Sequence, residues 1–334
     1  MSQPLPNVVP IVTIFGGSGF IGRYIAQRMA RAGWRVRVAV RRPNEAGFVR
    51  PYGVVGQVEP IQANIRDEAS TRRAIAGATA VVNCVGLLGE GGKQTFEAVM
   101  VEGAGRIARI AAEEGVQRLV QISAIGADPE SDSAYARAKG KGEAAVLAAF
   151  PAATILRPSV VFGDGDGFFR KFAGIARVAP VLMVPSPKTK FQPVYVDDVA
   201  AAAVAAITTE AAPGVYELGG PRVASLGKLV DEMLRVIRRK RWLFAMPEGL
   251  ARTQAWVFDT AQRASFGLFT NSLMTADQVR LLAKDNVVAP DAKGLADLGV
   301  QPTAMEAVLD SYLYVYRPHG QYDAIQESAE RLWN

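Results

Sequence analysis

The chain has 334 residues, of which 49% are hydrophobic and 21% charged, which excludes disordered and fibrous proteins. The one cysteine, Cys84, and the one histidine, His319, exclude an internal disulfide and leave little for a metal centre, so we expect no metal. The net charge of +6 fits an anionic ligand, an acidic partner, an anionic membrane surface, or simply a solubilising surface. We expect no membrane-spanning helix, because no apolar run reaches about 18 residues.

The first half of the chain alternates apolar runs with amphipathic stretches. Strands are expected at 8–15, 36–40, 58–62, 80–85, 118–123 and 153–156, and helices at 20–32, 67–76, 95–114 and 133–150. Strands that are apolar throughout and separated by helices indicate a parallel sheet covered on both faces. We therefore predict an α/β fold with a Rossmann-type doubly wound parallel sheet.

The rhythm changes after Pro158. A helix at 197–208, a strand at 215–218 and a helix from Ser225 are expected, and beyond Arg238 the chain is expected to be mostly helical, notably at 275–283 and 305–316. The predicted division is a dinucleotide-binding domain at 1–160, with a return contribution from about 190–222. A smaller, mainly helical region at 161–334 would serve as a substrate-like or docking part.

A glycine-rich loop follows the first expected strand directly and opens the first expected helix. Gly16, Gly19 and Gly22 form a GxxGxxG pattern in the context that a dinucleotide-binding loop requires. Glycines let the backbone approach a pyrophosphate, and the helix N-terminus offers N–H groups and a positive dipole end. The alternative is a tight turn that binds nothing. The loop residues expected to contact the cofactor are Gly16, Ser18, Gly19, Phe20, Ile21 and Gly22.

The end of the second strand indicates which dinucleotide is bound. NAD-binding folds usually carry Asp or Glu there, whereas this chain reads Arg41 and Arg42, with no carboxylate before Glu45. Guanidinium groups form forked, charge-assisted bonds to phosphate, so the two arginines favour the 2′-phosphate of NADPH. Arg23 is a third candidate. The alternative is that these arginines are solvated surface.

These motifs resemble the extended or atypical short-chain dehydrogenases/reductases over about residues 9–230. The resemblance rests on the glycine loop, Asn64-Ile65 (Asn where the family usually has Asp), Asn83-Cys84-Val85-Gly86, the YxxxK pattern of Tyr135 and Lys139, Arg157–Gly163, and Val196–Ala200. It implies that Asn64, Ile65, Cys84, Val85, Gly86, Ser123, Tyr135, Lys139, Pro158 and Val160 line the cofactor.

The same resemblance assigns roles to the catalytic positions. Lys139 would hold the ribose and lower the pKa of Tyr135, which shares its helix face and would exchange a proton with the substrate oxygen. The orienting Ser or Thr normally stands two residues beyond Ser123, at the position of Ile125, so Ser123 is a doubtful third member. We therefore expect a partly retained site in which Tyr135 and Lys139 hold NADPH without turning it over.

The later part of the sequence is similar to a narrower group. Tyr216–Pro221 and the run from Leu273 to Gln321 resemble the 39-kDa-type nucleotide-binding accessory subunits of respiratory complex I, the NADH:ubiquinone oxidoreductase. This implies tight NADPH binding and a role in assembly and stability of the peripheral arm near the quinone site. The partners would be other complex I subunits, at the cytoplasmic side of a bacterial inner membrane.

Two alternatives to the accessory subunit remain open from the sequence. The first is an active NADP-dependent reductase, epimerase or dehydratase acting on a sugar or isoprenoid-like substrate, which the pair Tyr135 and Lys139 favours. The second is an NADPH-sensing regulator, which nothing in the second half supports. We expect no nucleic-acid partner, because no DNA- or RNA-binding motif is present.

A basic run and a cluster of aromatic residues mark the second half. Arg235–Arg241 fits anionic lipid headgroups or an acidic partner, and equally the solvated end of a helix. The aromatic residues suggest a docking surface, although they would also suit a core. They are Trp242, Phe244, Trp256, Phe258, Phe266 and Phe269.

Overall fold

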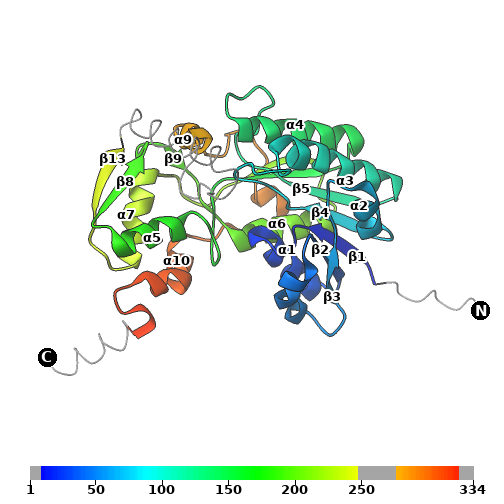
Figure 1. Ribbon diagram of the computed structural model, residues 1–334, viewed down its shortest axis with the longest axis horizontal. Helices are drawn as coiled ribbons and strands as arrows, with labels where there is room; N and C mark the ends of the chain where they lie inside the picture. The colour runs from blue at the N-terminus through cyan, green and yellow to red at the C-terminus, as the bar shows by residue number, and fades with distance from the viewer. Residues whose placement is uncertain (1–8, 247–275, 323–334) are drawn as a thin grey trace, which may run out of the picture. The chain divides into compact units, whose positions relative to one another are not determined.

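The computed structural model describes residues 9–246 and 276–322 of the chain (Figure 1). The fold divides into two compact units. Unit 1 comprises 1–158, 197–217 and 291–301, and unit 2 comprises 159–196, 218–290 and 302–334. The expected division did not assign residues 291–301 to the first unit.

Unit 1 is built on a seven-stranded sheet in the order β11-β6-β5-β4-β1-β2-β3. The strands are β1 (Ile11–Phe15), β2 (Arg35–Val40), β3 (Val58–Gln62), β4 (Ala80–Asn83), β5 (Arg118–Ile122), β6 (Thr154–Pro158) and β11 (Gly214–Leu218). All pairs from β3 through β6 are parallel. The strand order reverses between β1 and β4, which is where doubly wound folds bind nucleotides.

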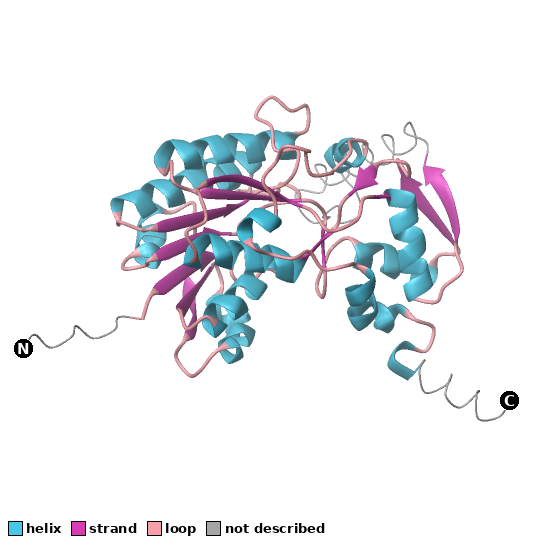
Figure 2. Ribbon diagram, turned by 180° about the vertical axis from the view of Figure 1, so that it is seen from behind, coloured by secondary structure: helices cyan, strands magenta, loops and turns pink. Residues whose placement is uncertain are grey.

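Helices cover both faces of this sheet, as Figures 1 and 2 show. They are α1 (Phe20–Arg31), α2 (Glu68–Ile75), α3 (Glu102–Glu113), α4 (Ala134–Ala149) and α6 (Val196–Thr208), with short turns η1 (Pro43–Tyr52), η2 (Glu97–Val101) and η3 (Ala296–Leu298). In Figure 1, α2, α3 and α4 lie on one face, and α1 and α6 on the other. The predicted doubly wound α/β sheet is confirmed.

Two helices of unit 1 begin where the sequence predicts, because a side chain caps the first turn. The Asp67 carboxylate accepts from the Ser70 N–H at 2.7 Å and starts α2. The Ser133 hydroxyl oxygen accepts from the Ala136 N–H at 3.2 Å and starts α4. Such caps satisfy backbone donors that a helix leaves unpaired at its N-terminus. The start of α4 fixes the position of Tyr135 and Lys139 on that helix.

Unit 2 is smaller and combines helices with three two-stranded sheets. Its helices are α5 (Phe169–Val178), α7 (Leu226–Val236), α9 (Ala276–Leu282) and α10 (Glu306–Leu313), with the turns η4 (Tyr314–Tyr316) and η5 (Gly320–Tyr322). Its strands are β7 (Val161–Phe162), β8 (Val181–Pro185), β9 (Lys190–Phe191), β10 (Val194–Tyr195), β12 (Ala224–Ser225) and β13 (Trp242–Met246), paired as β7–β10, β9–β12 and β8–β13. Side chains from α5, α7 and α10 form its core.

The residues after Arg238 depart from the helical expectation. Trp242–Met246 form β13, which pairs in parallel with β8. The five-residue run is too short to reveal a helical or strand period, and its partner strand lies about 60 residues earlier in the chain. Trp256, Phe258, Phe266 and Phe269 lie outside the described residues.

Candidate functional site

The glycine loop folds tightly between β1 and α1. Gly16 has φ +72°, in the left-handed region that favours glycine, and the Gly19 N–H donates to its carbonyl oxygen at 2.9 Å. A Cβ at Gly22 would lie 2.4 Å from the Gly16 oxygen, so only glycine lets α1 pack this closely on the loop. No side chain caps the helix at Gly19, and its first turn has no acidic residue. The positive end of α1 therefore suits an anionic group.

The end of β4 closes against the same loop. A Cβ at Gly16 would lie 3.3 Å from the Cys84 carbonyl carbon and from the Val85 nitrogen. The Cys84 N–H donates to Phe15 O at 2.9 Å, and the next residue but one, Gly86, is exposed. Burial raises the pKa of the Cys84 thiol to about 12, so the side chain stays neutral. The structure thus brings the predicted residues of both segments together where the strand order reverses.

Arg23 lies on the first helix among aromatic rings. Its guanidinium carbon is 5.4 Å from the ring centroid of Tyr24 and 5.9 Å from that of Phe20, both within the range of a cation–π contact. Ser18, Phe20 and Ile21 are half-buried. These contacts hold Arg23 along the surface of α1.

Arg41 and Arg42 lie just beyond β2 but have different neighbours. Arg42 pairs with Glu45 at 3.1 Å, and its side chain is 78% exposed. The side-chain amide of Gln94 is oriented so that its oxygen faces two arginines. This oxygen accepts from Arg41 Nη1 at 3.2 Å and from Arg66 Nη2 at 3.1 Å. Arg66 also donates to Lys93 O at 3.1 Å. Two guanidinium groups therefore converge on one side chain at the carboxyl ends of β2 and β3.

Arg66 is a candidate site residue that the sequence reasoning missed. It follows the segment Asn64-Ile65, which was expected to line the cofactor, and that position was its only signal. The Asn64 side-chain oxygen accepts from the Arg66 N–H at 3.2 Å, and this bond forms a turn directly after β3. Ile65 packs into the core with 8% of its surface exposed.

Tyr135 and Lys139 share a face of α4. The Lys139 ammonium lies 5.9 Å from the Tyr135 ring centroid and donates to Ile122 O at 3.2 Å. Burial lowers the pKa of Lys139 to about 8, and the Glu143 carboxylate offsets only part of this shift. Burial also raises the pKa of Tyr135 to about 12. At neutral pH the pair is a neutral phenol beside an ammonium, which can donate protons.

Gly86 lies close to this ammonium. A Cβ built at Gly86 would lie 3.5 Å from Lys139 Nζ, and apart from the adjoining residues of the chain nothing else lies within 4 Å of that Cβ. The uncapped N-terminus of α1, the Lys139 ammonium and the pair Arg41 and Arg66 supply donors that suit the phosphates and ribose of a dinucleotide. The residues present therefore fit such a cofactor.

Ser123 is engaged elsewhere in unit 1. Its hydroxyl donates to the Glu143 carboxylate, which is buried and also accepts from Arg157 Nη2 at 2.6 Å and Nε at 3.0 Å. Arg157 Nη1 lies 3.7 Å from a Glu217 oxygen as well. The hydroxyl is thus part of a buried ion-pair network and does not act as a separate donor. Position 125, where a working hydroxyl is expected, holds Ile125, whose N–H donates to Pro158 O at 3.0 Å.

The remaining predicted residues have structural surroundings. Pro158 ends β6 in unit 1, whereas Val160 belongs to unit 2 and packs against the core of that unit. Asp197, in the segment after Val196, forms a two-pronged pair with Arg28 of α1 at 2.6 and 2.7 Å. This pair fastens α6 to α1 in unit 1.

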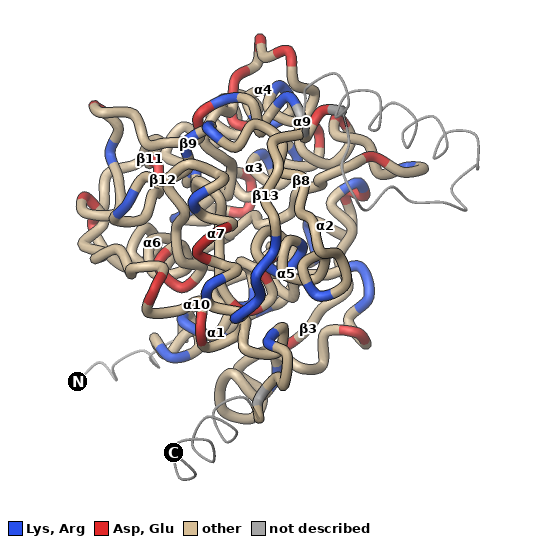
Figure 3. The backbone as a smooth tube through the Cα atoms, turned by 90° about the vertical axis from the view of Figure 1, so that its left-hand side faces the viewer, with Lys and Arg blue, Asp and Glu red and all other residues tan. Residues whose placement is uncertain are grey.

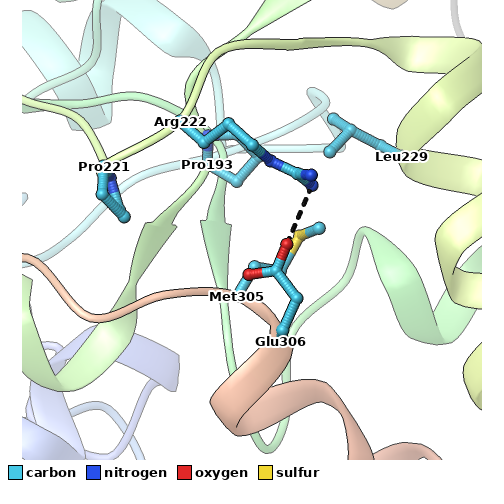
Figure 4. Close-up of a pocket in the computed structure, with 6 residues that line it drawn as sticks. All are labelled: Pro193, Pro221, Arg222, Leu229, Met305 and Glu306. Carbon is cyan, nitrogen blue, oxygen red and sulfur yellow. Dashed lines mark ion pairs between the residues drawn. The ribbon is translucent and has the colours of Figure 1, made fainter.

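Two features of unit 2 are explained by contacts within that unit. The Asp166 carboxylate accepts from Tyr312 OH at 2.5 Å and from the N–H of Arg170, in the first turn of α5, at 3.2 Å. A pocket of about 20 Å³ in unit 2 has room for one water (Figure 4). It is lined by Pro193, Pro221, Arg222, Leu229, Met305 and Glu306, with Arg222 and Glu306 paired at 3.2 Å. In the described ranges, no group of three His, Cys, Asp or Glu side chains could hold a metal ion.

A family model named NAD dependent epimerase/dehydratase family matches residues 12–219, which span the glycine loop, the arginines and the Tyr–Lys pair. The chain belongs to this family. Its likeness to solved structures agrees with the fold: a structure of MoeE5 in complex with UDP-glucose and NAD superposes with a TM-score of 0.66 at 17% identity, covering 90% of this chain and 97% of that one. The family match supports a nicotinamide dinucleotide as the cofactor.

Relatives within the family extend the similarity to the second half. Subunit 9 of the mitochondrial NADH dehydrogenase (ubiquinone) 1 alpha subcomplex from Arabidopsis thaliana is 34% identical, over 93% of this chain and 79% of that protein. A ceramide reductase from Caulobacter vibrioides is also 34% identical, over 77% of this chain and 82% of that protein. The resemblance to complex I accessory subunits is confirmed, since homologues of this chain are such subunits.

Proposed function

We propose that this protein is an NADPH-binding accessory subunit of a respiratory NADH:quinone oxidoreductase, which holds its nucleotide without turning it over. Similarity to complex I subunits over 93% of the chain carries the proposal, because it includes the part beyond the Rossmann unit. The subunit would support assembly and stability of the peripheral arm near the quinone site. In a bacterium it would lie at the cytoplasmic side of the inner membrane, in contact with its anionic surface. Within the part of the chain that the structure describes, none of the helices has the length and hydrophobicity of a membrane span.

The choice of NADPH rests on the arginines. Arg41 and Arg66 converge on Gln94 at the carboxyl edge of β2 and β3, and no carboxylate follows β2 before Glu45. Paired guanidinium groups match the oxygens of a ribose 2′-phosphate, whereas NADH would leave both cations without an anion. When bound, the nicotinamide would supply hydride chemistry, but the serine of the expected catalytic set is held by Glu143.

Purification from the native cell tests the proposal. A tagged chain is extracted in mild detergent, and co-purifying proteins and the nucleotide released on denaturation are identified by mass spectrometry. We expect complex I subunits and NADPH or NADP⁺. A matched variant, Gly22→Val, should lose the nucleotide, because the added side chain would collide with the Gly16 backbone. A chain that purifies alone, or one that carries only NAD⁺, would contradict the proposal.

A second candidate is a NADP-dependent reductase of a ceramide-like lipid ketone. The pair of Tyr135 and Lys139 on one face of α4 favours it, as does the similarity to a ceramide reductase. Tyr135 would then donate a proton to the carbonyl oxygen, and Lys139 would hold the cofactor ribose. The test is NADPH consumption by the purified chain with a lipid ketone, with Tyr135→Phe as the control. Turnover that the control abolishes would select this function over the first.

A further inference from the structure

An open cationic groove lies on unit 2 where α7 leads into β13. Its volume is about 680 Å³, and it is lined by Pro180, Asp231, Leu234, Arg235, Arg238, Arg239, Lys240, Arg241 and Trp242. Asp231 is the single carboxylate in this set, and it pairs with Arg235 at 3.1 Å. Figure 3 shows the run of Lys and Arg in blue between the two elements. The groove thus has an excess of four positive charges.

The arginines at the groove are held in place by the backbone of unit 2. Arg239 Nε donates to Tyr316 O at 2.7 Å, and Arg241 Nε donates to Ala176 O at 2.8 Å. A guanidinium fixed through Nε still carries N–H groups on both terminal nitrogens, which match phosphate oxygens. The pKa of Arg239 is lowered by burial and then by Arg241 and Arg177, so its charged neighbours repel it. A bound anion would relieve that repulsion.

Arg238 has a left-handed backbone conformation that residues other than glycine disfavour. Arg238 has φ +55°, and the N–H groups of Arg238 and Arg239 donate to the Arg235 and Leu234 carbonyls at 3.1 Å. This is the Schellman geometry at a helix C-terminus, which usually has glycine at the left-handed position. Here the position carries an exposed arginine at the rim of the groove instead.

An apolar strip runs beside the groove on the outer face of the β8–β13 sheet. Trp242 is 71% exposed, Phe244 54% and Met183 39%. Phe244 stands opposite Met183 in the parallel register, whereas Leu182 and Val184 point inward to the core. Large apolar side chains gathered on an exposed face indicate a contact surface.

We propose that the cationic groove and the apolar strip together form a binding site for anionic phospholipids at a membrane surface. Cations that meet headgroup phosphates beside aromatic side chains that enter the acyl boundary are the two parts of an interfacial membrane contact. A bilayer surface supplies anionic headgroups for the arginines and an apolar boundary for Trp242 and Phe244 in a single contact, whereas an acidic protein surface supplies only the anions. The proposal deepens the membrane placement in the proposed function and rests on it, but not on the identity of the nucleotide.

Vesicle flotation with the full-length protein tests this site. We expect binding to vesicles of phosphatidylcholine mixed with phosphatidylglycerol, none to phosphatidylcholine alone, and weakening as salt rises. The double variant Arg238→Gly, Lys240→Gln should bind about 25-fold more weakly, at about fivefold for each cation lost near the surface. Arg238→Gly suits the left-handed turn, so this loss is not a folding defect. The matched control, Arg31→Gln with Arg73→Gln on exposed helix positions of unit 1, should bind like the wild type.

A second readout follows Trp242 itself. Lipids brominated in their acyl chains should quench the tryptophan fluorescence of the wild type, and Trp242→Phe should lose most of that quenching. Three results would overturn the proposal. The first is absence of binding to the mixed vesicles, and the second is an equal loss of binding in the groove and control variants. The third is displacement of the protein from the vesicles by inorganic phosphate, added at constant total ionic strength. If the wild type does not bind vesicles but the groove variant no longer co-purifies with complex I, the surface is a protein interface. That result refutes the lipid site and leaves the proposed function intact.

Discussion

Arg41 is expected to set the preference for NADPH over NADH, and Arg42 is expected to contribute little. Both residues follow β2, but only Arg41 is aligned beside a second guanidinium, that of Arg66, by the Gln94 side chain. Arg42 is paired with Glu45 and largely exposed to solvent. A 2′-phosphate would therefore find Arg41 and Arg66 already aligned side by side. Arg42, in contrast, is a solvated cation that is already paired with Glu45.

The size of each effect follows from these contacts. A hydrogen bond to a charged group contributes about 1.5–3 kcal/mol, so Arg41→Ala should weaken NADPH binding by roughly 10- to 150-fold. An exposed ion pair contributes about 0.2–1 kcal/mol, so Arg42→Ala should change the NADPH dissociation constant less than about fivefold. Neither change should alter NADH binding, because NADH lacks the phosphate that the guanidinium groups contact.

Titration of nucleotide fluorescence with both cofactors checks this difference. The variants Arg41→Ala, Arg42→Ala and Arg66→Ala are compared with the wild type, and circular dichroism confirms that each one folds. An equal loss for NADPH and NADH in Arg41→Ala, or a larger loss in Arg42→Ala than in Arg41→Ala, would refute the assigned geometry.

Three further predictions concern the site and the groove. In chemical denaturation, Ser123→Ala should lower the free energy of unfolding by about 1 kcal/mol and Glu143→Gln by about 2 kcal/mol, since the latter leaves the partly buried Arg157 guanidinium with only the more distant Glu217 carboxylate, at 3.7 Å. Nucleotide affinity should be unchanged in Ser123→Ala if that hydroxyl serves only the ion-pair network. The pKa of Lys139 is about 8 in the folded protein, against an ordinary value of 10.5. Between pH 8 and 9 the unfolded chain therefore holds more protons at this residue than the folded protein does. The free energy of unfolding should consequently rise over this interval by up to about 1 kcal/mol. Lys139→Met should remove that rise; above pH 9 the raised pKa of Cys84 acts in the opposite direction. Arg238→Gly should stabilise the fold by about 1 kcal/mol in thermal unfolding, because it removes a left-handed non-glycine residue.

The parts of the fold that the sequence predicted are those that local chemistry decides. Asp67, Ser133 and Ser225 cap α2, α4 and α7, and each stands where the sequence analysis began a helix. Strands buried on both faces of the sheet must be apolar throughout, so the run of strands was visible without knowledge of their partners. The glycine loop was recognisable because the strand before it and the helix after it are local as well.

The contacts that escaped prediction join residues far apart in the chain. Arg28 and Asp197 are 169 positions apart, and no periodicity relates them. Arg66 meets Gln94 only because their two loops end at the same edge of the sheet. Ser123 could be seen as a doubtful catalytic residue, but its engagement by Glu143, 20 positions later, depends on the packing of α4 against β5.

Position 125 offers a direct test of why the site would hold a nucleotide without using it. Thr is β-branched like Ile but lacks its terminal methyl, so Ile125→Thr adds the missing hydroxyl donor at the cost of one methyl group, and Ile125→Val loses the same methyl without gaining a hydroxyl. If the absent hydroxyl limits the reaction, this variant should consume NADPH with a lipid ketone, whereas wild type and the matched control Ile125→Val should not. General acid–base groups typically contribute 10²–10⁴-fold, which is well within the range of a spectrophotometric assay.

The combination Ile125→Thr with Tyr135→Phe shows whether any new turnover uses the expected proton donor. Phe keeps the ring beside Lys139 but removes the phenol, so activity gained in the first variant should disappear in the second. Turnover by the wild-type chain that Tyr135→Phe abolishes would mean that no hydroxyl is needed at position 125. The Tyr135 phenol and the Lys139 ammonium would then be a working reductase pair, and the engagement of Ser123 by Glu143 would carry no information about catalysis.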